Sequence, residues 1–146
     1  MAKYQFRLET LRRLRIAHRD QQRSALADGY RAEEILAERR TTIADEQTAL
    51  REMQRSALVH RDLDVNQLVE VQRYQTVLKA NEQQLAEQAA RLAIEVERRR
   101  QAVVEADRAV RVLDKLDEQH RENHRREAQR QETKQLDEVA ITQWQR

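Results

Sequence analysis

Few residues in this chain have the types and spacing that metal binding or catalysis requires. His120 and His124 lie four positions apart, which would place both imidazoles on one face of a helix, as in a metal-binding pair. Arg121 follows His120 at the position where a general-base glutamate would sharpen that interpretation. His18 and His60 stand alone, and no serine, histidine and acid can be assembled into a catalytic set on one exposed helix. The pattern therefore favours a solvated charged face over a metal site.

Composition excludes two further kinds of active site. Phosphate-binding loops need several glycines, and the 146 residues contain only one, Gly29. The chain has no cysteine, so thiolate metal sites are excluded as well. We therefore expect no catalytic residue, no cofactor and no metal, and a protein that is not an enzyme.

The elements that must position any functional side chain are predicted to be helices. The chain has no proline and is rich in the residues that lose least entropy in a helix. Hydrophobic residues make up 39% and charged residues 37%, too few and too evenly spread for a thick apolar centre. They can line a stripe along a helix, which is typical of a coiled coil. Disorder is the competing interpretation of so charged a sequence, but the apolar spacing argues against it.

Apolar positions in the first half step by seven, four or three residues, as in a coiled-coil seam. This seam comprises Leu8, Leu11, Leu14, Ile16, Ala25, Ala32, Leu36, Ile43, Leu50, Met53 and Ala57. Gly29 lies within the same helix and should cost about 1 kcal/mol relative to alanine, which makes it a soft point.

The chain is predicted to reverse once, at residues 59–66. Asp62, Asp64 and Asn66 favour helix caps there, and Asp64 with Gln67 resembles a capping box. A second seam follows, with one extra four-residue step that resembles a stutter. Its positions are Tyr74, Leu78, Asn81, Leu85, Gln88, Leu92, Val96, Val103, Ala106, Val110 and Leu113.

The predicted fold is all-α: a two-helix antiparallel coiled-coil hairpin with an overhanging C-terminal helix. The whole chain, 1–146, forms one domain, with helix one at about 4–58, the turn at about 59–66 and helix two at about 67–140. Two helices joined by a short turn pack antiparallel. The second helix is the longer, so its C-terminal part has no partner within the hairpin.

Both ends of the chain carry residues that could bind a partner. The overhang is nearly devoid of large apolar residues from 118 to 134, and then ends in Leu136, Val139, Ala140, Ile141 and Trp144. An exposed apolar patch of this kind indicates a partner, although a frayed terminus is the alternative. Between Lys3 and Arg23 seven basic residues face only Glu9 and Asp20. This cationic end could enter an acidic or apolar socket, or its leucines could pack onto the return helix.

Charge and hydropathy exclude other partners. The net charge of +2 is spread along the chain and makes no nucleic-acid footprint. No segment approaches the 18 or so consecutive apolar residues of a membrane span, and the start has no apolar signal-peptide region. We expect a cytoplasmic protein without membrane insertion.

The two ends of the sequence resemble one family. Residues 4–15, YQFRLETLRRLR, resemble the F-x-L-E-T-L-L-R-L-R start of the flagellar export protein FliJ. Residues 126–140, REAQRQETKQLDEVA, are similar to the basic and acidic stretch of that family, which ends in L-D-E-x-A. The length and the hairpin architecture match over the whole chain.

The resemblance implies a component of the flagellar type III export apparatus at the cytoplasmic face of the membrane. Family members are similar in fold to the central stalk of rotary ATPases. Their paired termini would insert into the hexameric export ATPase and promote its assembly and activity, and the opposite region would contact the export gate. Export chaperones are a further class of partner that the family implies.

Carried onto this sequence, the resemblance implies two sets of contact residues. The ATPase-binding set is Phe6, Leu8, Leu11, Leu14, Leu136, Asp137 and Val139, which an antiparallel hairpin would bring together at its open end. The gate-binding set, toward the turn, is Leu50, Met53, Tyr74 and Leu78. Two alternatives stay open: the stalk coil of a related secretion or rotary ATPase machine, and a generic structural coiled coil that pairs as a dimer.

Overall fold

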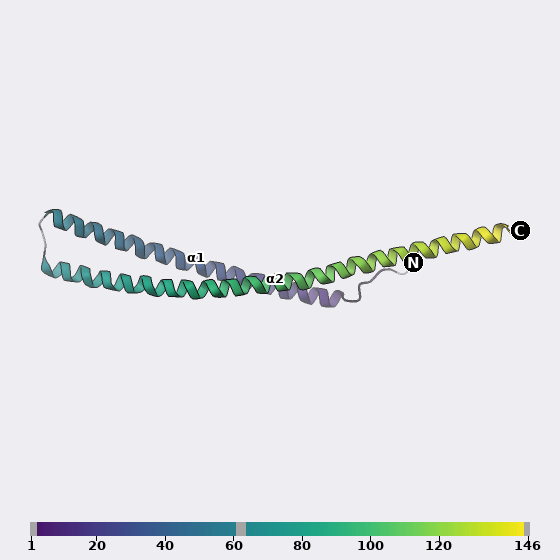
Figure 1. The fold of residues 1–146 in the computed structure, drawn as a ribbon, viewed down its shortest axis with the longest axis horizontal. Helices are drawn as coiled ribbons and strands as arrows, with labels where there is room; N and C mark the ends of the chain where they lie inside the picture. Colours follow the sequence, from purple (N-terminus) through teal and green to yellow (C-terminus); the bar gives the residue numbers. More distant parts are fainter. Residues whose placement is uncertain (1–2, 61–63, 145–146) are drawn as a thin grey trace. The chain divides into compact units, whose positions relative to one another are not determined.

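The computed structural model describes residues 3–60 and 64–144, most of which lie in two long helices (Figure 1). Helix α1 spans Glu9–His60, with 52 residues, and α2 spans Val65–Trp144, with 80 residues. Neither of the two described ranges contains a strand. The helices pack against each other, so the predicted all-α hairpin is confirmed.

The chain divides into two units, which we describe separately. Unit 1 comprises Met1–Gln22 and Ala102–Arg146, and unit 2 comprises Arg23–Gln101. In both units the contacts between α1 and α2 run in opposite directions along the sequence. In unit 2, for example, Ala25 contacts Arg99 whereas Gln47 contacts Glu82. Each unit is therefore an antiparallel pair of helical segments.

Helix α1 begins at Glu9, later than the predicted start near residue 4. Residues 3–6 have no regular structure and residues 7 and 8 form a turn, closed by a 3.2 Å hydrogen bond from the Glu9 N–H to the Phe6 carbonyl. In a helix Tyr4 and Phe6 would lie about 200° apart around the axis, since each residue turns the helix by about 100°. Both rings contact α2 here, which a helical start would not allow.

Helix α1 extends to His60 and α2 begins at Val65, so helix occupies part of the predicted turn at 59–66. Asp64 caps α2, because its Oδ1 accepts a 3.0 Å hydrogen bond from the N–H of Asn66. Asn66, the alternative cap, lies inside the helix. Asp62 lies outside the described residues. At its other end α2 continues to Trp144, beyond the predicted end near residue 140.

The core of unit 2 lies on the predicted seam. Leu78 is 2% exposed, Val96 3% and Leu50 8%. Gly29 is buried as well, and a Cβ at this position would lie 3.1 Å from Val96 Cγ2. The predicted soft point is therefore a site of close approach, where the absence of a side chain lets α1 and α2 come together.

The core of unit 1 follows steps of four and three residues along α2. Its buried apolar side chains are Ala106, Val110 and Leu113, with exposed fractions of 5%, 4% and 8%. The next position in this sequence of steps is not apolar: it is Asp117, which is 4% exposed. The stripe that packs unit 1 together therefore ends in a buried carboxylate.

Candidate protein-binding surfaces

Residues 3–8, which we call the N-terminal arm, are fastened to α2 at Asp117. The Tyr4 hydroxyl donates a 2.8 Å hydrogen bond to Asp117 Oδ1. Arg12 Nη1 donates to Oδ2 at 3.1 Å, and Arg121 Nη2 donates to the same oxygen at 2.9 Å. Both carboxylate oxygens therefore accept hydrogen bonds, as a buried charge requires.

These contacts set the ionisation of the groups around Asp117. Burial alone would raise the pKa of Asp117, but the hydrogen bonds from Tyr4 and Arg121 and the positive charges of Arg121 and Arg12 outweigh it, so the pKa is lowered. The pKa of Tyr4 is raised by burial and by the hydrogen bond to the carboxylate. Tyr4 therefore stays a neutral donor and Asp117 a charged acceptor at neutral pH.

Two ring pairs continue the contact between the arm and α2. The rings of Tyr4 and His124 meet edge-on with centroids 5.7 Å apart, and those of Phe6 and His120 meet at 6.0 Å. Two residues of extended chain span about 6.6 Å, and four residues of helix rise about 6 Å. The spacing of the two aromatic residues on the arm therefore matches the spacing of the two histidines on α2.

This arrangement adds a contact to the histidine pair. His120 and His124 were predicted to lie on a solvated charged face; His120 is exposed and His124 half-buried, and both rings also contact the arm. Among the described residues, no group of three histidine, cysteine, aspartate or glutamate side chains could hold a metal ion.

The N-terminal part of the ATPase-binding set is divided by its exposure. Leu11 and Leu14 project from α1 with 37% and 66% of their surface exposed. Phe6 and Leu8 are half-buried on the arm. The two leucines on α1 are therefore displayed to solvent, whereas the arm holds Phe6 against α2.

The C-terminal part of this set lies on the overhang of α2. Leu136 is 70% exposed and Val139 54%, and Asp137 is exposed as well. The arm makes its last ring contact at His124. Leu136 follows about 12 positions later, roughly 18 Å farther along the helix. Unit 1 therefore does not bring the two parts together, contrary to the expectation that an antiparallel hairpin would do so.

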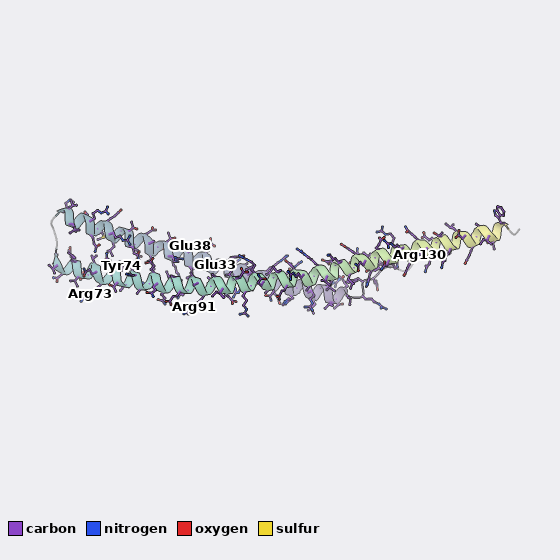
Figure 2. The ribbon with its side chains drawn as sticks, in the orientation of Figure 1. Glu33, Glu38, Arg73, Tyr74, Arg91 and Arg130 are labelled. Carbon is purple, nitrogen blue, oxygen red and sulfur yellow. The ribbon has the colours of Figure 1, made fainter. Side chains whose placement is uncertain are left out.

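The overhang also carries a basic ridge. Arg126, Arg130 and Lys134 follow each other at four-residue steps, and Arg130 is labelled in Figure 2. Arg126 donates a 3.0 Å hydrogen bond to Glu122. Beyond the ridge the overhang ends in Ile141, 60% exposed, and Trp144, 94% exposed. Charged and apolar surface thus follow each other along one helix.

The gate-binding set in unit 2 is split between core and surface. Leu50 and Leu78 are buried between α1 and α2, so they cannot contact a partner without separating the helices. Met53 is 64% exposed and Tyr74 46%. Tyr74, labelled in Figure 2, lies on α2. Its hydroxyl donates a 3.0 Å hydrogen bond to Glu46 of α1, and this bond raises the pKa of Tyr74.

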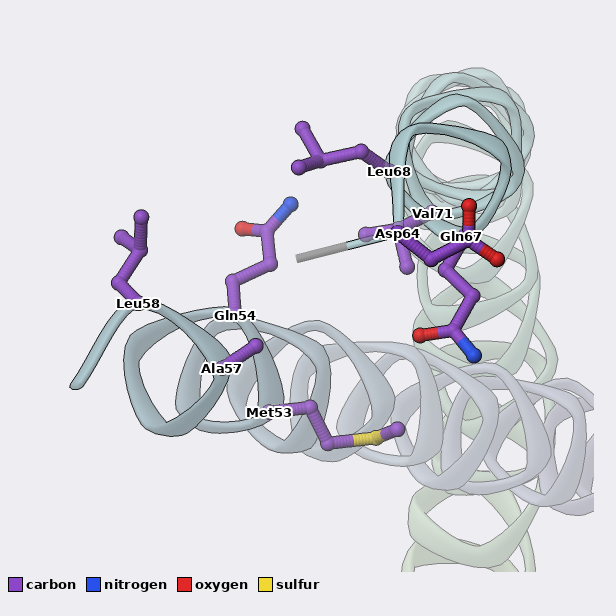
Figure 3. Close-up of a pocket in the computed structure, with 8 residues that line it drawn as sticks. All are labelled: Met53, Gln54, Ala57, Leu58, Asp64, Gln67, Leu68 and Val71. Atoms are coloured by element: carbon purple, nitrogen blue, oxygen red, sulfur yellow. The ribbon is translucent and has the colours of Figure 1, made fainter. Parts of the chain in front are cut away.

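An apolar pocket of about 330 Å³ lies between the ends of α1 and α2 in unit 2 (Figure 3). Its apolar lining comes from both helices, and polar groups stand beside it. The lining residues are Met53, Gln54, Ala57, Leu58, Asp64, Gln67, Leu68 and Val71. Val59 and Val65, which adjoin the lining residues Leu58 and Asp64 in the sequence, are both 74% exposed. Of the lining residues, only Met53 belongs to the predicted gate-binding set.

The family model described as Flagellar FliJ protein matches residues 4–146. The chain belongs to this family. The resemblance of its two ends to FliJ is therefore confirmed, and the match begins at Tyr4, the first contact residue of the arm. No curated protein and no solved structure matches the chain.

Membership of the FliJ family makes the chain a component of flagellar protein export. The family is a non-catalytic part of that machinery. Over the described residues, neither α1 nor α2 contains a stretch long and apolar enough to cross a bilayer.

Proposed function

We propose that this FliJ-family protein binds the hexameric flagellar export ATPase through unit 1 and promotes its assembly and activity. The observation that carries the proposal is the display of Leu11 and Leu14 on α1, at 37% and 66% exposure. Exposed leucines at a strongly basic helix end favour a socket with apolar walls and acidic rims. The protein acts at the cytoplasmic face of the membrane, without catalytic residues of its own.

The overhang supplies the second half of the same contact. Leu136 and Val139 offer exposed apolar surface, and Asp137 lies between them. Because the arm ends well before Leu136, we expect two separate contacts with the hexameric ATPase, one by Leu11 and Leu14 and one by the overhang, at different heights along the axis of the hexamer. A partner that binds the hexamer more tightly than its separate subunits stabilises the hexamer by mass action. Assembly and activity would then rise together.

A titration into the export ATPase of the same organism tests the proposal. Hydrolysis rate and hexamer content are measured against increasing amounts of the protein. We expect stimulation by the unaltered chain and its loss in Leu14→Asp and in Leu136→Asp, since each places a charge in the proposed contact. Ile94→Asp is the matched control, because Ile94 is 74% exposed and lies in unit 2. Equal stimulation by all four proteins would refute the contact.

We assign the gate contact to the turn end of unit 2. Met53 and Tyr74 are accessible there, and the pocket beside Met53 has an apolar lining. Leu50 and Leu78 support this surface from beneath, since both are buried. The contact surface of the proposal is thus Met53, Tyr74 and the pocket.

Binding to the isolated cytoplasmic domain of the export gate tests this assignment. Met53→Asp should weaken binding at least tenfold, because it would bury an unpaired carboxylate in the interface. Leu14→Asp should bind the gate as the unaltered chain does, which makes the two variants reciprocal controls. Weakening by Leu14→Asp and not by Met53→Asp would move the gate contact to unit 1.

A further inference from the structure

The N-terminal arm is held to α2 by side chains alone. Outside the two helices, the described backbone-to-backbone hydrogen bonds of this region join Glu9 to Phe6 and Arg12 to Leu8, and both stay within the N-terminal segment. On α2 the arm is held by the Tyr4 hydroxyl, which lies 2.8 Å from Oδ1 and 3.3 Å from the backbone carbonyl oxygen of Asp117. Two edge-on ring pairs and the Arg121 guanidinium, 5.7 Å from the centroid of the Tyr4 ring, complete the contact. The arm can therefore leave α2 without breaking a helical hydrogen bond.

Departure of the arm would not leave the buried carboxylate of Asp117 without hydrogen-bond partners. Asp117 accepts hydrogen bonds from Arg12, at 3.1 Å, and from Arg121, at 2.9 Å, in addition to that from Tyr4. Neither arginine belongs to the arm. Release would remove the ring contacts of Arg121 with Tyr4, at 5.7 Å, and of Arg12 with Phe6, at 5.9 Å, but not the hydrogen bonds of the two arginines to Asp117. Removing one partner from a buried charge is costly when it leaves that charge unpaired, and here two positive partners remain. The attached and released states can therefore lie close in free energy.

The attached arm occupies a residue that the proposed partner needs. Phe6 is half-buried, with its ring edge-on to His120 and the Arg12 guanidinium 5.9 Å from its centroid. An incoming surface can reach Leu11 and Leu14 directly, but it cannot enclose the Phe6 ring while that ring packs on α2. Contact with the whole N-terminal set thus requires the arm to come away.

We propose that the N-terminal arm is a releasable strap, fastened by the Tyr4–Asp117 hydrogen bond, that withholds Phe6 until a partner displaces it. The proposal rests on the proposed contact between unit 1 and the export ATPase. The partner that displaces the strap is a surface with an apolar socket for Phe6, and Leu11 and Leu14 give that surface its first contact. Strong binding therefore requires a partner that has both a socket for Phe6 and a surface that contacts Leu11 and Leu14.

The strap lowers the apparent affinity by the fraction of molecules whose arm is released. The apparent dissociation constant equals the intrinsic constant divided by that fraction. A hydrogen bond to a charged acceptor is strong enough to change a population ratio by about tenfold. Tyr4→Phe removes the donor and keeps the ring, so it should raise the released fraction by up to about tenfold and tighten binding by the same factor.

Arm release is measured first on the free protein. Brief digestion with trypsin, followed by intact mass measurement, reports cleavage after Arg7, which lies in the non-helical segment. We expect cleavage after Arg7 to be several-fold faster in Tyr4→Phe and also in Asp117→Asn. Tyr30→Phe is the matched control, because the Tyr30 hydroxyl accepts a 3.1 Å hydrogen bond from Arg100 in unit 2. Circular dichroism checks that each variant keeps its helices.

Affinity for the export ATPase is measured next on the same proteins. Tighter binding by Tyr4→Phe and Asp117→Asn, with Tyr30→Phe unchanged, supports the strap. Faster cleavage with unchanged or weaker binding overturns it, and so does unchanged cleavage in both variants. Absence of binding by the unaltered chain and every variant instead refutes the proposed ATPase contact, and the regulation falls with it. If the unaltered chain and all variants bind the ATPase with equal affinity, the strap is refuted and the proposed ATPase contact stands.

Discussion

Unit 2 is held together by an apolar seam, in which Leu78 and Val96 are almost fully buried and Gly29 brings the two helices close. Unit 1 begins with a similar seam but ends in the carboxylate of Asp117, ringed by donors from three places in the sequence. Apolar side chains stop stabilising the packed helices when they separate and are exposed to water, whereas polar groups can exchange one hydrogen-bond partner for another. The seam of unit 2 is therefore suited to holding two helices together permanently, and the hydrogen-bonded end of unit 1 to releasing one contact and forming another.

The largest effect that this comparison predicts is in the seam of unit 2. Leu78→Ala should lower the free energy of unfolding by about 3 kcal/mol, because it removes a buried side chain and leaves a cavity. Denaturant unfolding followed by circular dichroism measures the loss. Leu14→Ala, at a position 66% exposed, should change stability by well under 1 kcal/mol. Equal losses would show that the seam is no more important than the surface.

The close approach at Gly29 should give the next largest effect. Gly29→Leu would force a large side chain against Val96 and should cost about 2 kcal/mol by overpacking. Gly29→Ala gains about 1 kcal/mol of helix propensity, which offsets part of the cost of a Cβ placed 3.1 Å from Val96 Cγ2.

A double variant sharpens this test. Val96→Ala makes room opposite Gly29, so Gly29→Leu should cost less in that background than in the unaltered chain. Denaturant unfolding of the two single variants and the double variant gives the coupling between the positions. Additive losses would show that the two side chains do not meet, and would contradict the close approach.

The sequence predicted much of the fold because helical periodicity is a property of single segments. Residues Leu78, Val96, Ala106, Val110 and Leu113 were all placed on the seam and are all buried. The predicted start of α1 was wrong by about five residues, because nothing in the spacing of Tyr4 and Phe6 indicates that they lie outside the helix. Their match with His120 and His124 is visible only when residues more than 100 positions apart are aligned.

The contact sets were harder to divide into core and surface. All four residues of the gate-binding set lie near the turn and on the predicted seams. Their residue types alone do not show which of them are buried. Only the rotation of each helix about its axis decides that Leu50 and Leu78 are buried and the other two exposed. That rotation depends on the whole length of packed seam, which includes the close approach at Gly29.

The smallest predicted effect concerns the carboxylate of unit 1 and its dependence on pH. Asp117→Asn should lower the melting temperature by a few degrees at pH 7, since it weakens the acceptor of three donors. The pKa of Asp117 in the folded protein lies below its ordinary value of 3.8. The ionised side chain therefore contributes stability that is present above about pH 4 and is lost as the pH falls through the folded-state pKa.

Melting curves of the unaltered chain and of Asp117→Asn between pH 7 and pH 2 test this dependence. The difference in melting temperature should be constant down to about pH 4 and should shrink below it, as the aspartate becomes protonated. Asp114→Asn is a matched control at pH 7, because Asp114 is half-exposed and lies 3.7 Å from Arg12. If the difference for Asp117→Asn stayed constant to pH 2, its charge would contribute nothing, and the buried end of unit 1 would be held by its rings and its shape alone.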